Sequence, residues 1–213
     1  MEKEKMSAMD KDILTEVGSM CAGNASTALA QLLNRRIELK FPSIKFVSAA
    51  KLSWHLGGHP EEVILGIHMQ ILGGIRGNAL MVFPRKDAFT LIDILIGPLE
   101  EKSYSPTEIG ISALKEMGNV VISSYLSTLS AFTGVSAFAS TVNLASGASR
   151  YLVNLAFADL GKLEITETLL IEAVFIEKKR DISGNFYIIF DAKSIRTILN
   201  KAKELLDERR QND

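Results

Sequence analysis

The chain has 213 residues, of which 47% are hydrophobic and 23% are charged, and its 24 Lys and Arg against 25 Asp and Glu give a net charge of -1 at pH 7. The hydrophobic content is sufficient for a folded core and argues against disorder. Because the charge balance offers no broadly basic surface, we expect no nucleic acid as a partner and no attraction to an anionic membrane. Recognition must then rest on a local site.

Cysteine usage and the N-terminal residues favour a cytoplasmic protein. Cys21 is the only cysteine, so the chain cannot form an internal disulfide. Residues 1–11 are too charged to hold the apolar region of a signal peptide, and no apolar run reaches the ~18 residues of a spanning helix. We therefore expect no membrane insertion.

The apolar pattern of the first half predicts a helix, strands, a hairpin and a second helix. Pro42 divides one strand-forming run, a Gly-Gly pair at 73–74 marks the hairpin turn, and Gly97 closes the second helix. The predicted elements are a helix over 7–34, strands at 36–41 and 44–50, hairpin strands at 62–71 and 76–83, and a helix over 86–96.

The second half repeats this order. The Ser-Pro-Thr-Glu sequence at 105–108 indicates a capping box whose proline occupies the first helical position, and Gly134 ends the helix that follows. The charged tail at 201–213 is expected to fray into solvent. The other predicted elements are a helix to about 132, strands at 135–143, 151–158, 168–176 and 186–190, a turn at 183–185, and a helix over 193–206.

A short helical signature occurs twice, one hundred positions apart. Glu-Val-Gly-Ser at 16–19 matches Glu-Met-Gly-Asn at 116–119, and the similarity extends outward from both, which indicates an internal duplication. The joint between the halves, at 97–105, is short, and neither half alone has enough strands to hide a sheet. We therefore predict a single domain over 1–213, with related halves at about 7–98 and 105–208 that share one sheet.

The second signature helix has an unusual exposed side. On a helical wheel the core side carries residues such as Leu114 and Tyr125. The opposite ridge is almost entirely small and polar: Ser112, Glu116, Asn119, Ser123, Ser127 and Ser130. Solvated helix faces usually carry long charged side chains, whereas a serine ridge lets another protein approach closely. The alternative is plain solvation, because an exposed Glu and Asn three apart are common on helices.

The first signature helix shows the same pattern on its exposed side. Its members are Asp12, Glu16, Ser19, Gly23, Ser26, Thr27 and Ala30. The signature glycines, Gly18 and Gly118, cost helix stability, and close packing of helix on sheet is sufficient to explain them. The ridge with its carboxylate and amide is therefore the candidate site.

These residues resemble the CheC, CheX and FliY phosphatases of prokaryotic chemotaxis, which dephosphorylate the response regulator CheY, and the resemblance is to CheC in particular. The family motif is Asp or Ser, three residues, Glu, two residues, Asn, and a proline about 23 positions on. The second copy here has Ser112, Glu116 and Asn119, but Val142 at the proline position. The first copy is Asp12, Glu16, Ser19 and Pro42, with serine in place of the asparagine.

The resemblance implies a CheC-like α+β fold in which both halves form one antiparallel sheet and the two signature helices lie exposed side by side. It also implies an enzyme, a protein aspartyl-phosphate phosphatase. In-line attack of water on the phosphoryl group would be supported by a lysine and by Mg²⁺ that CheY itself supplies, so no cofactor of the chain's own is expected. CheD, the receptor deamidase, is an expected partner of the family.

Residue roles follow from this resemblance as hypotheses. Asn119 would hold the attacking water by donating and accepting hydrogen bonds, and Glu116 would pair with a lysine of CheY. Asp12, Ser112 and Ser123 are expected to contact the partner. Ser19 is too short to position the water, so the site of Glu16 and Ser19 is expected to be weak or inactive.

Two non-catalytic functions compete with the phosphatase. The chain could bind phosphorylated CheY without hydrolysing it, or serve as an adapter for CheD. A flagellar switch subunit such as FliY normally carries an additional C-terminal domain, for which we expect no room here.

Other motifs are weaker. His55 and His59 have the spacing of a metal pair, but intervening glycines indicate a loop, and no metal site is expected. His68 lies in a strand pattern and is expected to be packed or solvated. The glycine-rich run at 73–77 lacks the Lys-Ser or Lys-Thr ending of a phosphate loop, and Cys21 faces the core as an inert thiol.

Overall fold

The computed structural model of the chain describes residues 6–34, 38–47, 63–97, 106–148, 151–152, 168–177 and 182–212. The helices are α1 (Ala8–Leu33), α3 (Arg85–Ile96), α4 (Glu108–Thr133) and α6 (Ala192–Asn212). The strands are β1 (Glu38–Val47), β2 (Val63–Gly73), β3 (Gly77–Pro84), β4 (Ala137–Ala139), β5 (Asn143–Ala148), β6 (Thr168–Glu177) and β7 (Ile182–Phe190). The predicted α+β class is confirmed.

The strands within the described residues join one seven-stranded sheet in the order β1-β6-β7-β3-β2-β4, and β5 also pairs with β2. Each pairing is antiparallel, as expected. Strands of the two predicted halves are interleaved in one sheet, since β1 of the first half pairs with β6 of the second at one edge and β3 pairs with β7 at the centre. Such an order is what two related halves sharing a sheet would produce, although the duplication itself stays a prediction.

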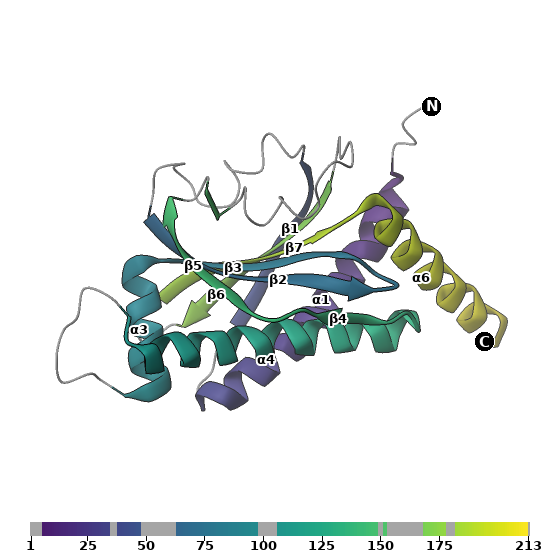
Figure 1. The fold of residues 1–213 in the computed structure, drawn as a ribbon. Coiled ribbons are helices and arrows are strands. Elements are labelled where there is room, and N and C mark those ends of the chain that lie inside the picture. The colour runs from purple at the N-terminus through teal and green to yellow at the C-terminus, as the bar shows by residue number, and fades with distance from the viewer. Residues whose placement is uncertain are drawn as a thin grey trace.

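Helices α1 and α4 pack against each other beneath one face of the sheet, with α3 and α6 beside them (Figure 1). The core between these helices and the sheet is one cluster of buried apolar residues. Within it, the ring of Tyr125 on α4 meets Phe186 on β7 edge to face, with centroids 5.7 Å apart. Complete burial raises the pKa of Tyr125 well above its usual value.

The start of α4 corrects one prediction. The N-cap is Thr107, whose backbone is extended (φ -70°, ψ 161°). Its Oγ1 accepts a hydrogen bond from the Gly110 amide at 3.1 Å. The capping box predicted at 105–108, with Pro106 as the first helical residue, is therefore wrong. Thr107 is the N-cap residue, so Pro106 precedes the helix. The end at Gly134, with φ of 65°, is as predicted.

Three strand predictions also need correction. The two strands expected around Pro42 are one strand, β1, whose pairing with β6 shifts register between Lys40 and Ser43. A bulge accommodates a proline, which has no amide hydrogen to donate. The single strand expected at 135–143 is two shorter strands, β4 and β5, which pair with successive parts of β2.

The turn expected at 183–185 is also wrong, because these residues lie inside β7. Gly184 allows the ring of Phe83 to pack closely on β7, because a Cβ atom at this position would lie 2.3 Å from that ring. Residues 151–152, the start of another expected strand, are helical. His55, His59 and Ser105, with most of the predicted joint, lie outside the described residues.

Candidate functional site

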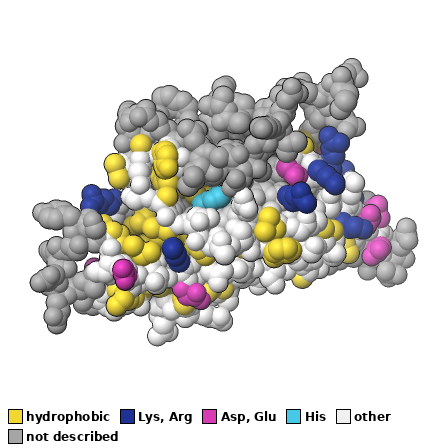
Figure 2. Space-filling model, in the orientation of Figure 1, with side chains coloured by type: hydrophobic (Ala, Val, Ile, Leu, Met, Phe, Trp, Pro, Cys, Tyr) yellow, Lys and Arg dark blue, Asp and Glu magenta, His cyan; other side chains and the backbone are white. Residues whose placement is uncertain are grey.

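The pair Glu116 and Asn119 lies on the solvent side of α4. Both side chains are exposed, while Met117 is fully buried and Gly118 is buried between them. In Figure 2 much of the surface along α4 is white, with a few acidic and hydrophobic side chains among the white ones. The carboxylate and carboxamide therefore project from a surface of small residues, as the wheel predicted.

Most of the predicted serine ridge on α4 is accessible. Ser112, Ser123 and Ser127 are exposed. Ser130 is different, because it is half-buried and its hydroxyl donates to the Ala137 carbonyl at 3.0 Å and accepts from the Ala137 amide at 2.9 Å. It ties the helix to β4 and is not part of the open ridge, which we now define as Ser112, Glu116, Asn119, Ser123 and Ser127.

The buried side of α4 holds this ridge outward. A Cβ atom on Gly118 would lie 2.5 Å from Cγ2 of Ile67, a fully buried residue of β2. Glycine therefore permits the helix to approach the sheet closely at the turn that carries Glu116 and Asn119. The packing reason expected for this glycine is confirmed.

A hydrogen bond connects two members of the open ridge. The Ser123 hydroxyl donates to Oδ1 of Asn119 at 3.3 Å, one helical turn away. The helical period predicted both residues on one face, whereas the contact between them was not predicted. The spacing of four residues was the available signal, because such pairs are neighbours on a helix.

The first signature helix, α1, presents a similar set. Asp12, Glu16 and Ser19 are exposed, and Val17 and Gly18 between them are buried. Ser26 and Ala30, expected on the same ridge, are half-buried. The structure thus places a carboxylate and a hydroxyl on α1 where α4 has a carboxylate and a carboxamide.

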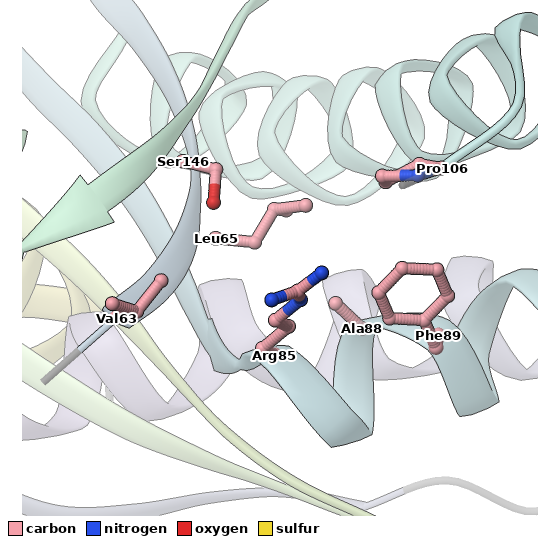
Figure 3. A pocket seen from close by; sticks show the side chains of 7 residues that line it. All are labelled: Val63, Leu65, Arg85, Ala88, Phe89, Pro106 and Ser146. Carbon is pink, nitrogen blue, oxygen red and sulfur yellow. The ribbon is translucent and has the colours of Figure 1, made fainter. Parts of the chain in front are cut away.

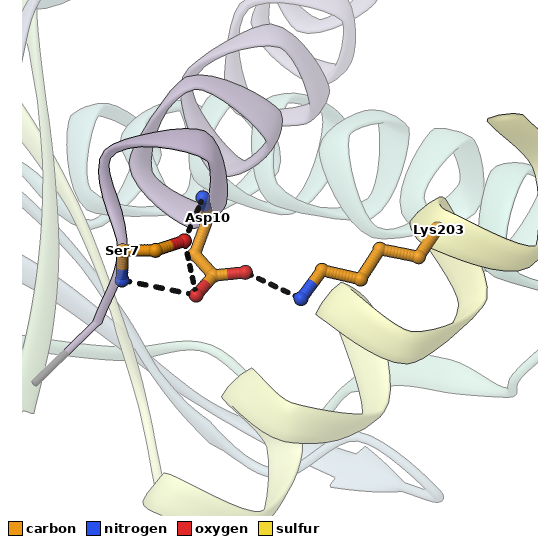
Figure 4. Close-up of polar contacts among 3 residues, drawn as sticks. All are labelled: Ser7, Asp10 and Lys203. Carbon is orange, nitrogen blue, oxygen red and sulfur yellow. Dashed lines mark hydrogen bonds and ion pairs between the residues drawn. The ribbon is translucent and has the colours of Figure 1, made fainter. Parts of the chain in front are cut away.

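The N-terminus of α1 is fixed by Asp10 (Figure 4). Oδ2 of Asp10 accepts from the Ser7 amide at 3.1 Å and from the Ser7 hydroxyl at 2.8 Å, and Oδ1 lies 2.6 Å from Nζ of Lys203 on α6. The hydrogen bonds with Lys203 and Ser7 hold the pKa of Asp10 below its usual value. The tail at 201–213, which was expected to fray, is instead helical to Asn212, and Lys203 joins it to α1.

A separate hollow of about 270 Å³ lies between α3, β2, β5 and Pro106, which precedes α4 (Figure 3). Hydrophobic side chains gather on this part of the surface in Figure 2, with Lys and Arg side chains at its edges. Among the described residues that line it, Arg85 is the only charged one, and its guanidinium lies 5.8 Å from the ring centroid of Phe89. The hollow contains none of the residues of the open ridge.

Two other candidates have structural explanations. His68 is buried, with Nε2 2.8 Å from Oδ1 of Asn78 on the neighbouring strand. Cys21 is fully buried, and this burial raises the pKa of the thiol to about 12, as expected for an inert cysteine.

Among the described residues, no three His, Cys, Asp or Glu side chains are grouped so that they could hold a metal ion. In the same part of the chain, no helix is long and apolar enough to cross a membrane.

The sequence is similar to a known family and to two named bacterial proteins. The CheC-like family model matches residues 9–45, which include the first signature helix and Pro42. The chain is 34% identical over 124 residues to a Bacillus subtilis protein named CheY-P phosphatase CheC, covering 57% of this chain and 59% of that protein. It is 30% identical over 131 residues to the flagellar motor switch phosphatase FliY of the same organism, covering 61% of this chain and 33% of that protein.

Comparison with solved structures agrees on the fold. Thermotoga maritima FliY superposes with a TM-score of 0.71 at 18% identity, covering 93% of this chain and 98% of that structure. CheX from Desulfovibrio desulfuricans gives a TM-score of 0.54 at 12% identity, covering 83% and 99%. The FliM middle domain from H. pylori gives 0.62 at 18% identity, covering 92% and 99%. These likenesses confirm the CheC-like fold, and the sequence matches confirm the resemblance to the CheC, CheX and FliY family.

Proposed function

We propose that this chain, a relative of the CheC, CheX and FliY proteins, hydrolyses the aspartyl phosphate of CheY with a site on α4. The observation that carries this proposal is the exposure of Glu116 and Asn119 together on a helix side otherwise formed by small residues. Two matched relatives are named phosphatases, and one is named for CheY-P. The matches span only part of those proteins, so the substrate and activity are proposed from the site.

In the proposed reaction, the oxygen of a water molecule forms a bond to phosphorus as the bond between phosphorus and the aspartyl oxygen breaks. The products are inorganic phosphate and a free aspartate of CheY, and the proton lost by the water passes to the phosphate. Asn119 accepts no proton. It holds the water near ~3 Å from phosphorus through hydrogen bonds that a carboxamide can donate and accept at once.

Glu116 has a binding role in this proposal. It lies three residues before Asn119 on the same exposed side of α4, so both side chains can enter one cleft of a partner. Its carboxylate would pair with a lysine of CheY and so fix the position of the helix along the partner. Mg²⁺ belongs to CheY as part of the substrate.

The open ridge suits such a partner because small side chains leave the helix backbone close to the contact surface. A ridge of lysine and glutamate would hold CheY farther away. On α1, Ser19 has a hydroxyl on a shorter stem than asparagine, so we expect Glu16 to contact CheY while hydrolysis there is slow or absent. The two helices therefore differ in chemistry more than in exposure.

A binding function without catalysis is the second candidate. The FliM middle domain shares this fold, so the fold alone does not indicate an enzyme. A CheY-binding module or an adapter for CheD would form a stoichiometric complex without accelerating release of phosphate.

The discriminating experiment follows phosphate release from phosphorylated CheY with the purified chain present at one-twentieth of the CheY concentration. A phosphatase hydrolyses all of the substrate through repeated turnover, whereas a binding module protects or leaves unchanged a stoichiometric fraction. Glu116→Ala should raise KM about 10-fold with a smaller change in kcat, because it removes a charged contact to CheY. Release at the spontaneous rate with the parental chain would refute the proposal. A parallel titration with CheD would reveal the adapter function.

A further inference from the structure

We propose that Ser123 is a positioning residue for the carboxamide of Asn119, an inference that rests on the proposed phosphatase function. The Ser123 hydroxyl donates to Oδ1 of Asn119 at 3.3 Å. The two residues are four positions apart on α4, which places them one above the other on the same face. Both are exposed, so the hydrogen bond lies on the surface offered to CheY.

An unrestrained asparagine positions a water molecule poorly. The torsion between its Cβ and Cγ atoms has a broad preference, so the carboxamide plane rotates freely at an exposed site. A hydrogen bond to Oδ1 restricts this rotation, and because the carboxamide is planar it also directs Nδ2. Ser123 therefore favours one orientation of Asn119 before CheY binds.

The contact leaves Asn119 able to act. A carbonyl oxygen has two lone pairs, so Oδ1 can accept from Ser123 and from the attacking water at the same time. Ordering the carboxamide in the free protein reduces the ordering required in the transition state, which raises the rate of the chemical step. Ser123, expected at first to contact the partner, thus acts through Asn119.

The first signature helix lacks both members of this pair. Ser19 stands at the position equivalent to Asn119, and Gly23 stands at the position equivalent to Ser123. Gly23 is exposed, and a Cβ atom there would meet nothing within 4 Å, so packing does not require glycine. The carboxamide and the hydroxyl are both missing from α1, as expected if the two function as a unit.

The test measures kcat and KM for phosphate release from phosphorylated CheY with the full chain. Ser123→Ala should lower kcat about 3- to 10-fold and change KM less than about 2-fold, since one hydrogen bond that orders the carboxamide is lost. Ser123→Thr keeps the hydroxyl and should retain kcat within about 2-fold of the parent. Ser123→Ala with parental kcat, or with only a raised KM, overturns the inference.

The control is Thr90→Ala on α3, which removes a comparable hydroxyl bonded to the Lys86 carbonyl at 3.0 Å and lies outside the open ridge. Its kcat and KM should equal those of the parent. Asn119→Ala, measured beside it, separates the two proposals. If Asn119→Ala is as fast as the parent, the phosphatase site itself is wrong. If it is inactive while Ser123→Ala is parental, only the positioning role fails.

A gain of function on α1 provides the second test. In an Asn119→Ala background, Ser19→Asn supplies a carboxamide alone, and Ser19→Asn with Gly23→Ser supplies the carboxamide and its hydroxyl partner. The open space at Gly23 allows this serine without displacing a neighbour. The double substitution should hydrolyse CheY phosphate about 3- to 10-fold faster than Ser19→Asn alone. Equal rates would contradict a positioning role for the hydroxyl.

Discussion

Substitution of Gly118 by alanine tests whether close packing of α4 on the sheet supports the site. The added Cβ would lie 2.5 Å from Cγ2 of Ile67, about 1 Å short of an ordinary contact. Ile67 is fully buried, so the helix or the strand must move. Overfilling a core of this kind costs ~1 to 3 kcal/mol of unfolding free energy.

Helix propensity acts in the opposite direction, and the chain offers a control for it. Alanine is more favourable than glycine in a helix by ~1 kcal/mol, so Gly118→Ala should have a net loss of about 1 kcal/mol or slightly more. Gly23→Ala on α1 has the same propensity gain without a contact within 4 Å, and it should stabilise the protein by ~0.5 to 1 kcal/mol. The difference between the two variants isolates the packing cost.

Urea and thermal unfolding of both variants measure this difference. For a chain of this size, 1 kcal/mol corresponds to roughly 2 to 4 °C in Tm, so the two variants should differ by several degrees. Displacement of α4 should also lower the rate of phosphate release in Gly118→Ala, because Asn119 is the next residue. Equal stabilisation by both alanines would refute the packing explanation and the support it gives to the site.

Three further predictions concern groups away from the open ridge. Asp10→Asn removes the charge that pairs with the partly exposed Lys203 and leaves one acceptor oxygen for Ser7, and should lower the unfolding free energy by ~0.5 to 1 kcal/mol at pH 7. Because folding lowers the pKa of Asp10, this stabilisation is present above the ordinary carboxyl pKa and is lost as the pH falls through the lowered value, so parent and variant should converge in acid unfolding curves. Cys21, with a pKa of about 12, should react with a thiol reagent only after unfolding in urea, and rapid reaction in the native protein would contradict its burial. Asn78→Leu removes the partner of buried His68 and should cost ~1 to 3 kcal/mol, measured by urea unfolding; an unchanged midpoint would show that the pair contributes nothing.

The faces of α1 and α4 could be predicted from the sequence because both helices are 26 residues long and their apolar residues repeat with the helical period. That period alone placed Glu116 and Asn119 in solvent. Close packing of Gly118 on the sheet was predicted, but its partner Ile67 was not, because Ile67 lies on a strand far away in the sequence.

Contacts between residues far apart in the chain could not be predicted from the sequence pattern. The interleaving of strands from the two halves depends on pairings between residues far apart in the chain, such as Leu80 with Tyr187. The contact between Asp10 and Lys203 joins opposite ends of the chain and could not be read from local sequence, which is why the tail at 201–213 was expected to fray. Gly184 was mistaken for a turn residue because a glycine required by a neighbouring ring and one required by a turn look alike in sequence.

The central claim is that a carboxamide on α4, and not the corresponding hydroxyl on α1, positions the water that attacks CheY phosphate. The most direct measurement compares kcat for phosphate release in Asn119→Ala and Ser19→Ala. We expect Asn119→Ala to lose about 100-fold in kcat, because the attacking water is no longer held, and Ser19→Ala to stay within about 2-fold of the parent. Parental turnover by Asn119→Ala, or an equal loss in Ser19→Ala, would contradict the account.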